Sequence, residues 1–178
     1  MNIFYLKITE LLKKYPEEEI LTYSDTNKIS SKERLLQHCT GRFLVQNVLK
    51  KIYNMQKPQI ITRNKKPQLT DNKINFSLAH SGDIVIVAFD NYPCGIDLEY
   101  MRPVNLEGMS KRYNKNFISL EDFYKFWTNY EASIKLGSTG EFEYNLIFQN
   151  EYYLTLLSAS KMSSTPVFID FLNYIKNC

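Results

Sequence analysis

The sequence predicts an α+β fold made of two similar halves, each with one long helix packed on a small, mainly antiparallel sheet. Three observations support this class. A helical pattern is followed by a run of strand patterns, and the same order then occurs a second time. With 178 residues and 44% apolar content, the chain can bury a core. No long Gly/Ser linker divides it, and we expect the halves to be residues 1–103 and 104–178.

Two helical patterns open the first half. In residues 4–15, Phe4, Ile8 and Leu11 recur at helical spacing, and Pro16 follows as a stop signal. A longer helix is predicted to begin at Ser30, with the glutamate of a capping box at position 33, and to run to residue 52. We expect both helices to turn an apolar face to the core.

Strand patterns fill the middle of the chain. Residues 60–62 form a short apolar run, and the basic segment 63–67 that follows has the composition of a turn. Apolar residues then alternate in 74–78, run continuously in 84–89 and alternate again in 94–98. The turns between these runs are short, so we expect a buried antiparallel meander.

The second half begins with a helix over residues 120–136. Ser119 and Asp122 are its start signals, and Gly137 is its stop. Two alternating stretches, 142–148 and 152–157, are separated by a three-residue turn and predict a hairpin. A last strand or helix is expected within 166–176.

Composition narrows the class of protein without assigning a function. The net charge of +3 is spread along the chain, which does not indicate a nucleic-acid-binding protein but suits an anionic ligand. The cysteines Cys39, Cys94 and Cys178 lack metal-ligand spacing and are expected to be reduced thiols. No segment has the length of a membrane span or the pattern of an export signal. A cytoplasmic, soluble protein is the expectation.

Asp97 and Glu99 form the first chemical motif. They lie two residues apart on a predicted strand, so both side chains point to the same face. Two carboxylates directed at one point repel each other unless a cation joins them, and Mg²⁺ prefers such oxygen ligands. The alternative is the solvent-facing side of an amphipathic strand, a common pattern.

Two further motifs carry candidate residues. Trp127, Glu131 and Lys135 are spaced by four and share one helix face, although Glu131 and Lys135 could be a simple surface ion pair. The predicted strand 75–81 ends in His80 and Ser81, which could bind a phosphate or could be ordinary turn residues. The sequence has no nucleophile elbow, P-loop or dinucleotide-binding glycine motif.

Taken in order, the segments FSLAHS, GIDLE and WTNYEASIK resemble the motif series of the Sfp-type 4′-phosphopantetheinyl transferases, in the holo-acyl-carrier-protein synthase superfamily. That family has a strand ending in S-H-S, then G-[IV]-D-[IVL]-E, then W-[ST]-x-K-E-[AS]-x-x-K. The match covers residues 58–137, and three motifs in the same order are more specific than any one of them.

The resemblance implies transfer of phosphopantetheine from coenzyme A to a serine of an acyl or peptidyl carrier protein, with release of adenosine 3′,5′-bisphosphate. By motif position, it implies that Asp97, Glu99 and Glu131 bind Mg²⁺. Lys135 is expected near the pyrophosphate, and His80 near the ribose 3′-phosphate. Asp97, Glu131 and Lys135 are thus the expected catalytic residues, with either Glu131 or a metal-bound water as the base.

The remaining coenzyme A residues are expected around the same site. Lys66 and Pro67 resemble the G-K-P turn that borders the adenine, with Lys65 in the place of glycine. Ser81 follows the motif histidine. Arg42 is a candidate replacement for a helix arginine of the family.

Three positions depart from the family pattern. Tyr130 stands where the family has lysine, and Ala79 stands where it has serine. Gln37 stands at the helix position of the arginine, for which Arg34 or Arg42 could substitute. These changes affect the expected affinity for coenzyme A more than metal binding.

The expected partner is an acidic carrier domain, and Lys111, Arg112 and Lys115 could meet it, unless they belong to a solvated loop. A monomer that binds neither nucleic acid nor membranes is expected. One rival hypothesis is a degenerate, non-catalytic module that binds coenzyme A or a carrier. Another is a magnesium-dependent phosphodiesterase or nuclease, with Asp83 or Asp90 as an additional ligand.

Overall fold

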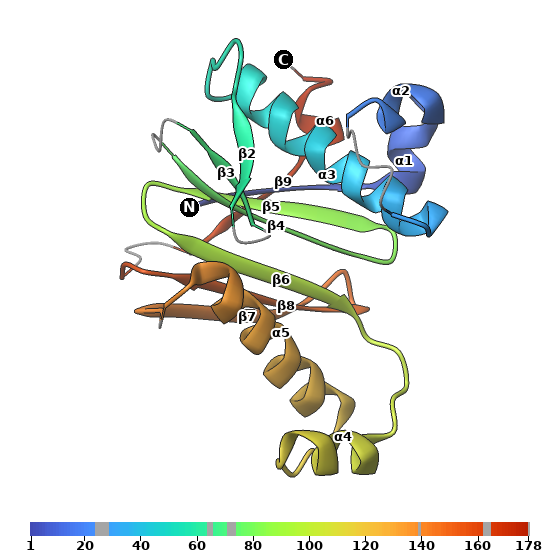
Figure 1. Ribbon diagram of the computed structural model, residues 1–178, viewed down its shortest axis with the longest axis vertical. Coiled ribbons are helices and arrows are strands. Elements are labelled where there is room, and N and C mark those ends of the chain that lie inside the picture. The colour runs from blue at the N-terminus through green and yellow to red at the C-terminus, as the bar shows by residue number, and fades with distance from the viewer. Residues whose placement is uncertain (24–28, 64–65, 71–73, 139, 162–164, 178) are drawn as a thin grey trace.

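The computed structural model describes residues 1–23, 29–63, 66–70, 74–138, 140–161 and 165–177. Helices and strands are mixed along this part of the chain (Figure 1), which confirms the α+β class. The elements are, in order, β1 (Asn2–Lys7), α1 (Ile8–Leu12), α2 (Glu17–Leu21), α3 (Lys32–Lys51), β2 (Ile60–Arg63), β3 (Lys66–Leu69), β4 (Asn75–Ser81), β5 (Ile84–Asp90), β6 (Cys94–Tyr100), α4 (Leu106–Tyr113), α5 (Leu120–Leu136), β7 (Phe142–Phe148), β8 (Tyr152–Ser158), β9 (Val167–Asp170) and α6 (Phe171–Tyr174).

In the described residues, the strands form a four-stranded sheet, a three-stranded sheet and a separate hairpin. The strand order is β4-β5-β1-β9 in the first and β6-β8-β7 in the second, while β2 pairs with β3. All pairs are antiparallel except β1 with β9. Each larger sheet combines strands from both sides of residue 103, because β9 joins the first and β6 joins the second. The division into two similar halves at that residue stays a prediction.

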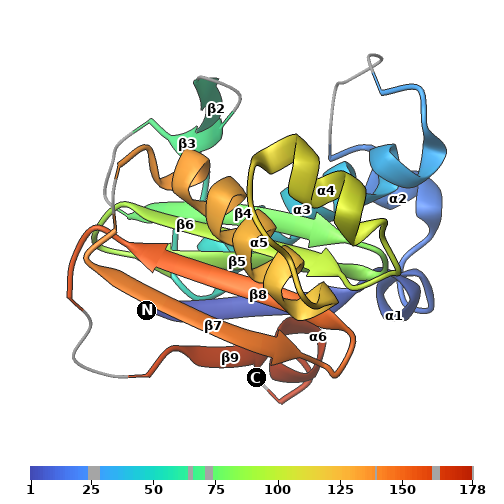
Figure 2. The ribbon, with the colours of Figure 1, turned by 90° about the horizontal axis from the view of Figure 1, so that it is seen from below.

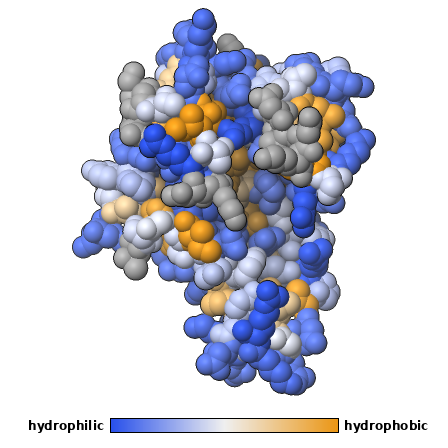
Figure 3. All heavy atoms as spheres, in the orientation of Figure 1, coloured by the Kyte–Doolittle hydropathy of each residue, from blue (hydrophilic) through white to orange (hydrophobic). Residues whose placement is uncertain are grey.

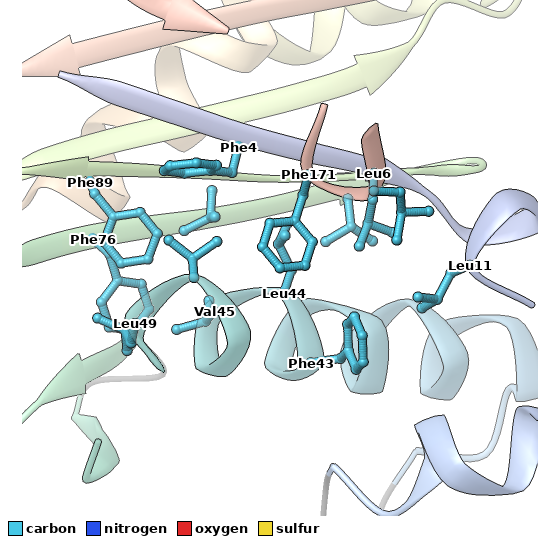
Figure 4. Packing of buried hydrophobic residues seen from close by; sticks show 14 of the residues in the cluster. Phe4, Leu6, Leu11, Phe43, Leu44, Val45, Leu49, Phe76, Phe89 and Phe171 are labelled. Atoms are coloured by element: carbon cyan, nitrogen blue, oxygen red, sulfur yellow. The ribbon is translucent and has the colours of Figure 1, made fainter. Parts of the chain in front are cut away.

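Helix α3 covers one face of the four-stranded sheet and encloses an apolar core, which we call the α3 layer (Figure 4). Phe4, Leu44, Phe89 and Phe171 are among its members, each with at most 1% of its surface exposed. Helix α5 lies along the three-stranded sheet, against β6 and β8 (Figure 2). We call this second contact the α5 layer.

The start of the chain is a strand, so the helix predicted over residues 4–15 was wrong in its first part. Ile3 faces the core on one side of the four-stranded sheet, while Phe4 and Leu6 face the core on the other side. Both faces of β1 are therefore buried, and an extended segment satisfies its backbone by pairing with β5 and β9. Only Ile8–Leu12 is helical.

The predicted meander was confirmed for β4 and β5, which pair antiparallel, and wrong for its third strand, which belongs to another sheet. Strand β6 pairs with β8 and not with β5. Its outer edge meets β4 through side chains: the Ser77 hydroxyl accepts from the Ile96 backbone N–H, and the Ser81 hydroxyl accepts from the Tyr100 N–H, both at 3.0 Å. The two sheets are thereby joined without a continuous ladder.

The other elements follow the sequence pattern closely. Helix α3 starts one residue later than predicted, with Ser31 as its cap, whereas α5 has the predicted bounds, with Ser119 as its cap. Gly137 ends α5 at a φ of 81°, a conformation that glycine adopts readily. The predicted hairpin is β7 and β8, and the last segment holds both a strand and a helix. Helices α2 and α4 were not predicted.

The basic segment 63–67 is only partly a turn. Arg63 ends β2, and Lys66 and Pro67 begin β3. Asn64 and Lys65 lie outside the described residues, as does Cys178. Cys39 and Cys94 are free and buried.

The surface drawn in Figure 3 is mostly hydrophilic, with separate apolar patches. Within the described part of the chain, no helix combines the length and the hydropathy that crossing a bilayer requires.

Candidate active site

Two adjoining cavities lie where α3, the end of β4, β6 and α5 come together. The larger has a volume of about 930 Å³ and the smaller about 390 Å³, and His38 and His80 line both. Most of the residues singled out from the sequence line one of them. The larger cavity is bordered by Arg34, Ser81, Glu99 and Trp127, and the smaller by Arg42, Pro67, Asp97 and Lys135.

Asp97 is the most buried carboxylate of this region, with 6% of its surface exposed. Its Oδ1 accepts a hydrogen bond from the Lys135 ammonium at 2.6 Å, and the same ammonium donates to the Ile96 carbonyl. Burial raises the pKa of the Asp97 carboxyl to about 6, although the Lys135 charge opposes this shift. Its Oδ2 is buried without a hydrogen-bond partner among the described residues.

Glu99 is half-buried and lies between two donors. Its Oε2 accepts from the Ser81 hydroxyl at 2.8 Å, and its Oε1 accepts from the Trp127 indole N–H at 3.4 Å. The Ser81 hydroxyl also accepts from the backbone of β6, so its orientation is fixed from both sides. The sequence indicated Ser81 as a coenzyme A ligand, and that role stays a prediction; Ser81 lines the larger cavity, and its hydroxyl donates to Glu99.

Glu131 lies on α5, one turn before Lys135, and is half-buried. Its charge and that of Glu99 both contribute, after burial, to the raised pKa of Asp97, so both lie near enough to act on that carboxyl. The three carboxylates do not form one metal-binding cluster. Across the residues that the structure describes, no three His, Cys, Asp or Glu side chains are grouped closely enough to hold a metal ion. The predicted three-carboxylate site therefore stays a prediction.

The donors fit a magnesium ion in part. Mg²⁺ is commonly held by one or two carboxylates, while waters and substrate phosphates complete its shell. A buried carboxylate oxygen with no partner, Asp97 Oδ2, is an oxygen that a cation would satisfy. Asp97 and Glu99 could thus hold the ion, and Glu131 stays the predicted third member.

Basic side chains also line the smaller cavity. Arg42 donates to the Thr62 hydroxyl at 3.2 Å, and burial lowers its pKa. The pKa of His80 is also lowered, first by burial of the imidazole and then by the nearby charges of Lys135 and His38, although the residue as a whole keeps an exposed surface. At neutral pH this imidazole is uncharged and can still donate one N–H.

The sequence interpretation overlooked His38. It lies on α3 between Arg34 and Arg42, at intervals of four residues, so the three basic side chains share one face of the helix. That spacing was the available signal. Gln37, where the family has arginine, is buried, and its amide donates to the Gly82 carbonyl at 2.9 Å, which supports the turn after His80.

The other departures lie at the edge of the site or outside it. Tyr130 is 48% exposed and stacks near Phe126 on the outer face of α5. Ala79 is buried in β4. Lys66 does not border either cavity, and its ammonium donates instead to the backbone carbonyls of Cys94 and Lys135.

Two of the three residues of the basic cluster Lys111, Arg112 and Lys115 belong to a helix. Lys111 and Arg112 lie in the last turn of α4, and Lys115 follows that helix. Lys111 pairs with Glu107 at 2.6 Å, while the Lys115 ammonium lies over the Phe126 ring at 5.5 Å.

Comparison with known proteins gives a consistent set of relatives, although no protein-family model matches the chain. It is 26% identical to 4′-phosphopantetheinyl transferase Sfp of Bacillus subtilis (strain 168), over 79% of this chain and 71% of Sfp. It is 32% identical to 4′-phosphopantetheinyl transferase ffp of Bacillus subtilis and 30% identical to psf-1 of Bacillus pumilus, in each case over 56% of this chain. The chain spans about half the length of the last two, 51% and 49%. The motif order, the α+β fold and these matches identify the chain as a distant relative of the Sfp-type 4′-phosphopantetheinyl transferases.

Proposed function

We propose that this protein transfers the phosphopantetheine group of coenzyme A to a serine of an acyl or peptidyl carrier protein, in a Mg²⁺-dependent reaction that releases adenosine 3′,5′-bisphosphate. One observation carries the proposal: the buried Asp97–Lys135 pair lines the same small cavity as His38, Arg42 and His80. A carboxylate suited to a metal ion and a set of donors suited to phosphate therefore adjoin each other, which supports transfer of a phosphorylated group.

The basic wall is suited to the anionic end of coenzyme A. Arg42 brings a permanent charge and His80 an N–H donor, and we assign these two to the ribose 3′-phosphate. Lys135, which lines the same cavity, is assigned to the pyrophosphate. Pro67 adds an apolar surface for the adenine.

In the proposed reaction, the serine oxygen of the carrier forms a bond to the β-phosphorus of coenzyme A as the bond to the bridging oxygen breaks. Adenosine 3′,5′-bisphosphate leaves with that oxygen. The serine proton passes to Glu131, a half-buried carboxylate for which no hydrogen-bond partner is found within the described residues. Lys135 stabilises the charge on the pyrophosphate. When bound by Asp97 and Glu99, Mg²⁺ would neutralise charge on the phosphates.

We propose an acidic carrier domain as the protein partner, met by the exposed basic residues at the end of α4 and just after it. Arg112 and Lys115 are the stronger candidates, because Lys111 is already paired with Glu107. The attraction between opposite charges would speed the encounter and weaken as salt is added. A cytoplasmic monomer that binds no nucleic acid and no membrane completes the proposal.

Two rival functions are less well supported. A nuclease would need further acidic ligands, but Asp83 accepts hydrogen bonds from Thr9 at the start of α1, and Asp90 accepts from the Ser158 hydroxyl. A non-catalytic binding module is favoured only by Tyr130 and Ala79. Tyr130 is 48% exposed beside Phe126, and Ala79 is buried in β4.

The experiment combines the protein with coenzyme A, Mg²⁺ and a panel of apo-carrier proteins, and weighs the carriers by mass spectrometry. We expect one carrier to gain the mass of one phosphopantetheine group. In Asp97→Asn, the rate should fall by about a hundredfold or more, because both the metal site and the Lys135 partner are lost. Glu10→Gln is the matched control, since Glu10 is an exposed carboxylate that pairs only with Lys13 in the described structure.

Each result has a distinct meaning. Wild-type protein that binds coenzyme A but modifies no carrier would support the binding module. A normal rate in Asp97→Asn would refute the metal assignment. Loss of the rate in Glu10→Gln as well would point to a general effect of charge rather than to the site.

A further inference from the structure

The Lys66 ammonium is held by two backbone carbonyls, a role that differs from the predicted contact with adenine. It donates to the backbone carbonyl of Cys94 at 3.2 Å and to that of Lys135 at 2.6 Å. Burial lowers the pKa of this amine, with a smaller contribution from the charge of Lys135. A partly buried cation is costly unless polar groups replace its water, and the two carbonyls take that role.

The two carbonyls belong to elements that touch through their backbones. A side chain on Gly95 of β6 would place its Cβ 2.0 Å from the Ala132 carbonyl oxygen and 2.9 Å from the Leu136 nitrogen of α5. No side chain therefore separates the strand from the helix at this point. Lys66 donates hydrogen bonds to the carbonyls of Cys94 and Lys135, which immediately precede Gly95 and Leu136 and so lie directly beside this contact.

A second bridge joins the same two elements on the side of the cavity. The Lys135 side chain donates to Asp97 Oδ1 and to the Ile96 carbonyl, both on β6. Lys66 holds the main chain of Lys135, and Lys135 in turn holds Asp97. The carbonyls in the last turn of a helix lack intrahelical partners and attract cations, so a lysine from another element is well suited to this position.

We propose that Lys66 is a positioning residue: its ammonium fixes the last turn of α5 against β6 and so keeps the Lys135 ammonium on Asp97. Its effect on transfer depends on the proposed function, whereas its effect on the α5–β6 contact does not. Lys66 acts through backbone carbonyls from outside the cavity, and Pro67 is the residue of this strand that borders it.

The test compares Lys66→Met, which keeps the apolar stem and removes the donors, with Lys66→Arg, which keeps a charged donor. Arg63→Met is the matched control, because Arg63 lies opposite Lys66 in the same hairpin and is exposed. Hydrogen exchange followed by mass spectrometry reports on the contact without any substrate. The same variants are then assayed for transfer, with kcat and KM for coenzyme A measured separately.

In Lys66→Met, amide exchange in peptides covering residues 94–98 and 132–137 should accelerate about tenfold or more, since a charged hydrogen bond is lost. Exchange in α3 should stay unchanged. We expect kcat to fall about tenfold with little change in KM, and Lys66→Arg to restore part of both effects. Arg63→Met should behave as wild type.

Unchanged exchange in those peptides would overturn the proposal, as would a rise in KM alone, which indicates direct contact with coenzyme A. If wild-type protein transfers nothing while the exchange result holds, the proposed function fails and the positioning role stands. Should Lys66→Met fail to fold, Lys66→Gln replaces it, because the shorter amide cannot reach both carbonyls, and the same exchange criterion applies.

Discussion

The α3 layer and the α5 layer place one helix each against a sheet, but they do so with different chemistry. The α3 layer is filled with large apolar side chains, among them Phe4, Leu44 and Phe89. In the α5 layer, strand and helix meet through backbone at Gly95, and polar groups are buried beside that contact. Thr128 of α5 and Thr155 of β8, for example, are fully buried, with their hydroxyl oxygens 2.7 Å apart.

The difference separates stability from positioning. Apolar contacts are non-directional, so the α3 layer can stabilise the fold without fixing any one atom closely. Hydrogen bonds and backbone contacts have strict geometry, so the α5 layer fixes where Lys135 stands relative to Asp97. Damage to the first layer should therefore act on stability, and damage to the second should act on the site.

The largest expected loss of stability comes from the α3 layer. Phe89 is 1% exposed and contacts the rings of Phe4, Tyr53 and Phe76. Phe89→Ala should lower the free energy of unfolding by about 3–5 kcal/mol, measured by urea denaturation. The folded fraction should keep its transfer rate. The control is Tyr92→Ala, at a 55% exposed position close in sequence, which should change the free energy of unfolding little. An equal loss in that variant would show that burial in the α3 layer does not account for the effect of Phe89→Ala.

The next effect comes from the backbone contact of the α5 layer. Gly95→Ala introduces a clash with the Ala132 carbonyl that no rotamer can relieve, and should cost about 1–3 kcal/mol or more. Transfer by the folded protein should also fall, because Lys135 moves away from Asp97. Gly108→Ala is the control, since a Cβ there meets only the Asn105 side chain, at 3.3 Å. A stable, fully active Gly95→Ala variant would remove the distinction between the layers.

The smallest effect concerns the buried hydroxyl pair. Thr128→Val removes the group that contacts the Thr155 hydroxyl and should cost about 1 kcal/mol in urea denaturation, because a buried oxygen loses a partner. Combined with Thr155→Val, the two costs should not add, since both variants break the same bond. Simple additivity would mean that the two hydroxyls act independently.

Local signals predicted much of the fold and part of the site. Ser119 and Gly137 mark the ends of α5 because capping and left-handed glycine conformations depend on adjacent residues. The alternation around Asp97 also placed it correctly on a strand. By contrast, no local signal indicated that β6 would pair outside the predicted meander. Its pairing depends on residues 152–158, which lie far along the chain.

The site shows the same limit. The spacing of His38 to Arg34 and Arg42 could have identified it. The sequence could not have shown that this face of α3 turns towards β4. The motif residue Lys66 was identified, yet its contacts with two backbone carbonyls have no sequence signature, since any residue supplies a carbonyl.

By itself, the sequence determined the α+β class, the bounds of α5, the approximate bounds of α3 and of the strands β4 to β8, and the candidate residues Asp97, Glu99, Glu131 and Lys135. These follow from periodicity, capping and residue chemistry, which act over a few residues. Only the tertiary structure decided that β1 lies inside a sheet, that β6 joins β8, and that Lys135 reaches Asp97. Such outcomes depend on which surfaces, distant in sequence, can exclude water by packing together. The free energy of that packing is set by the whole chain and not by neighbouring residues.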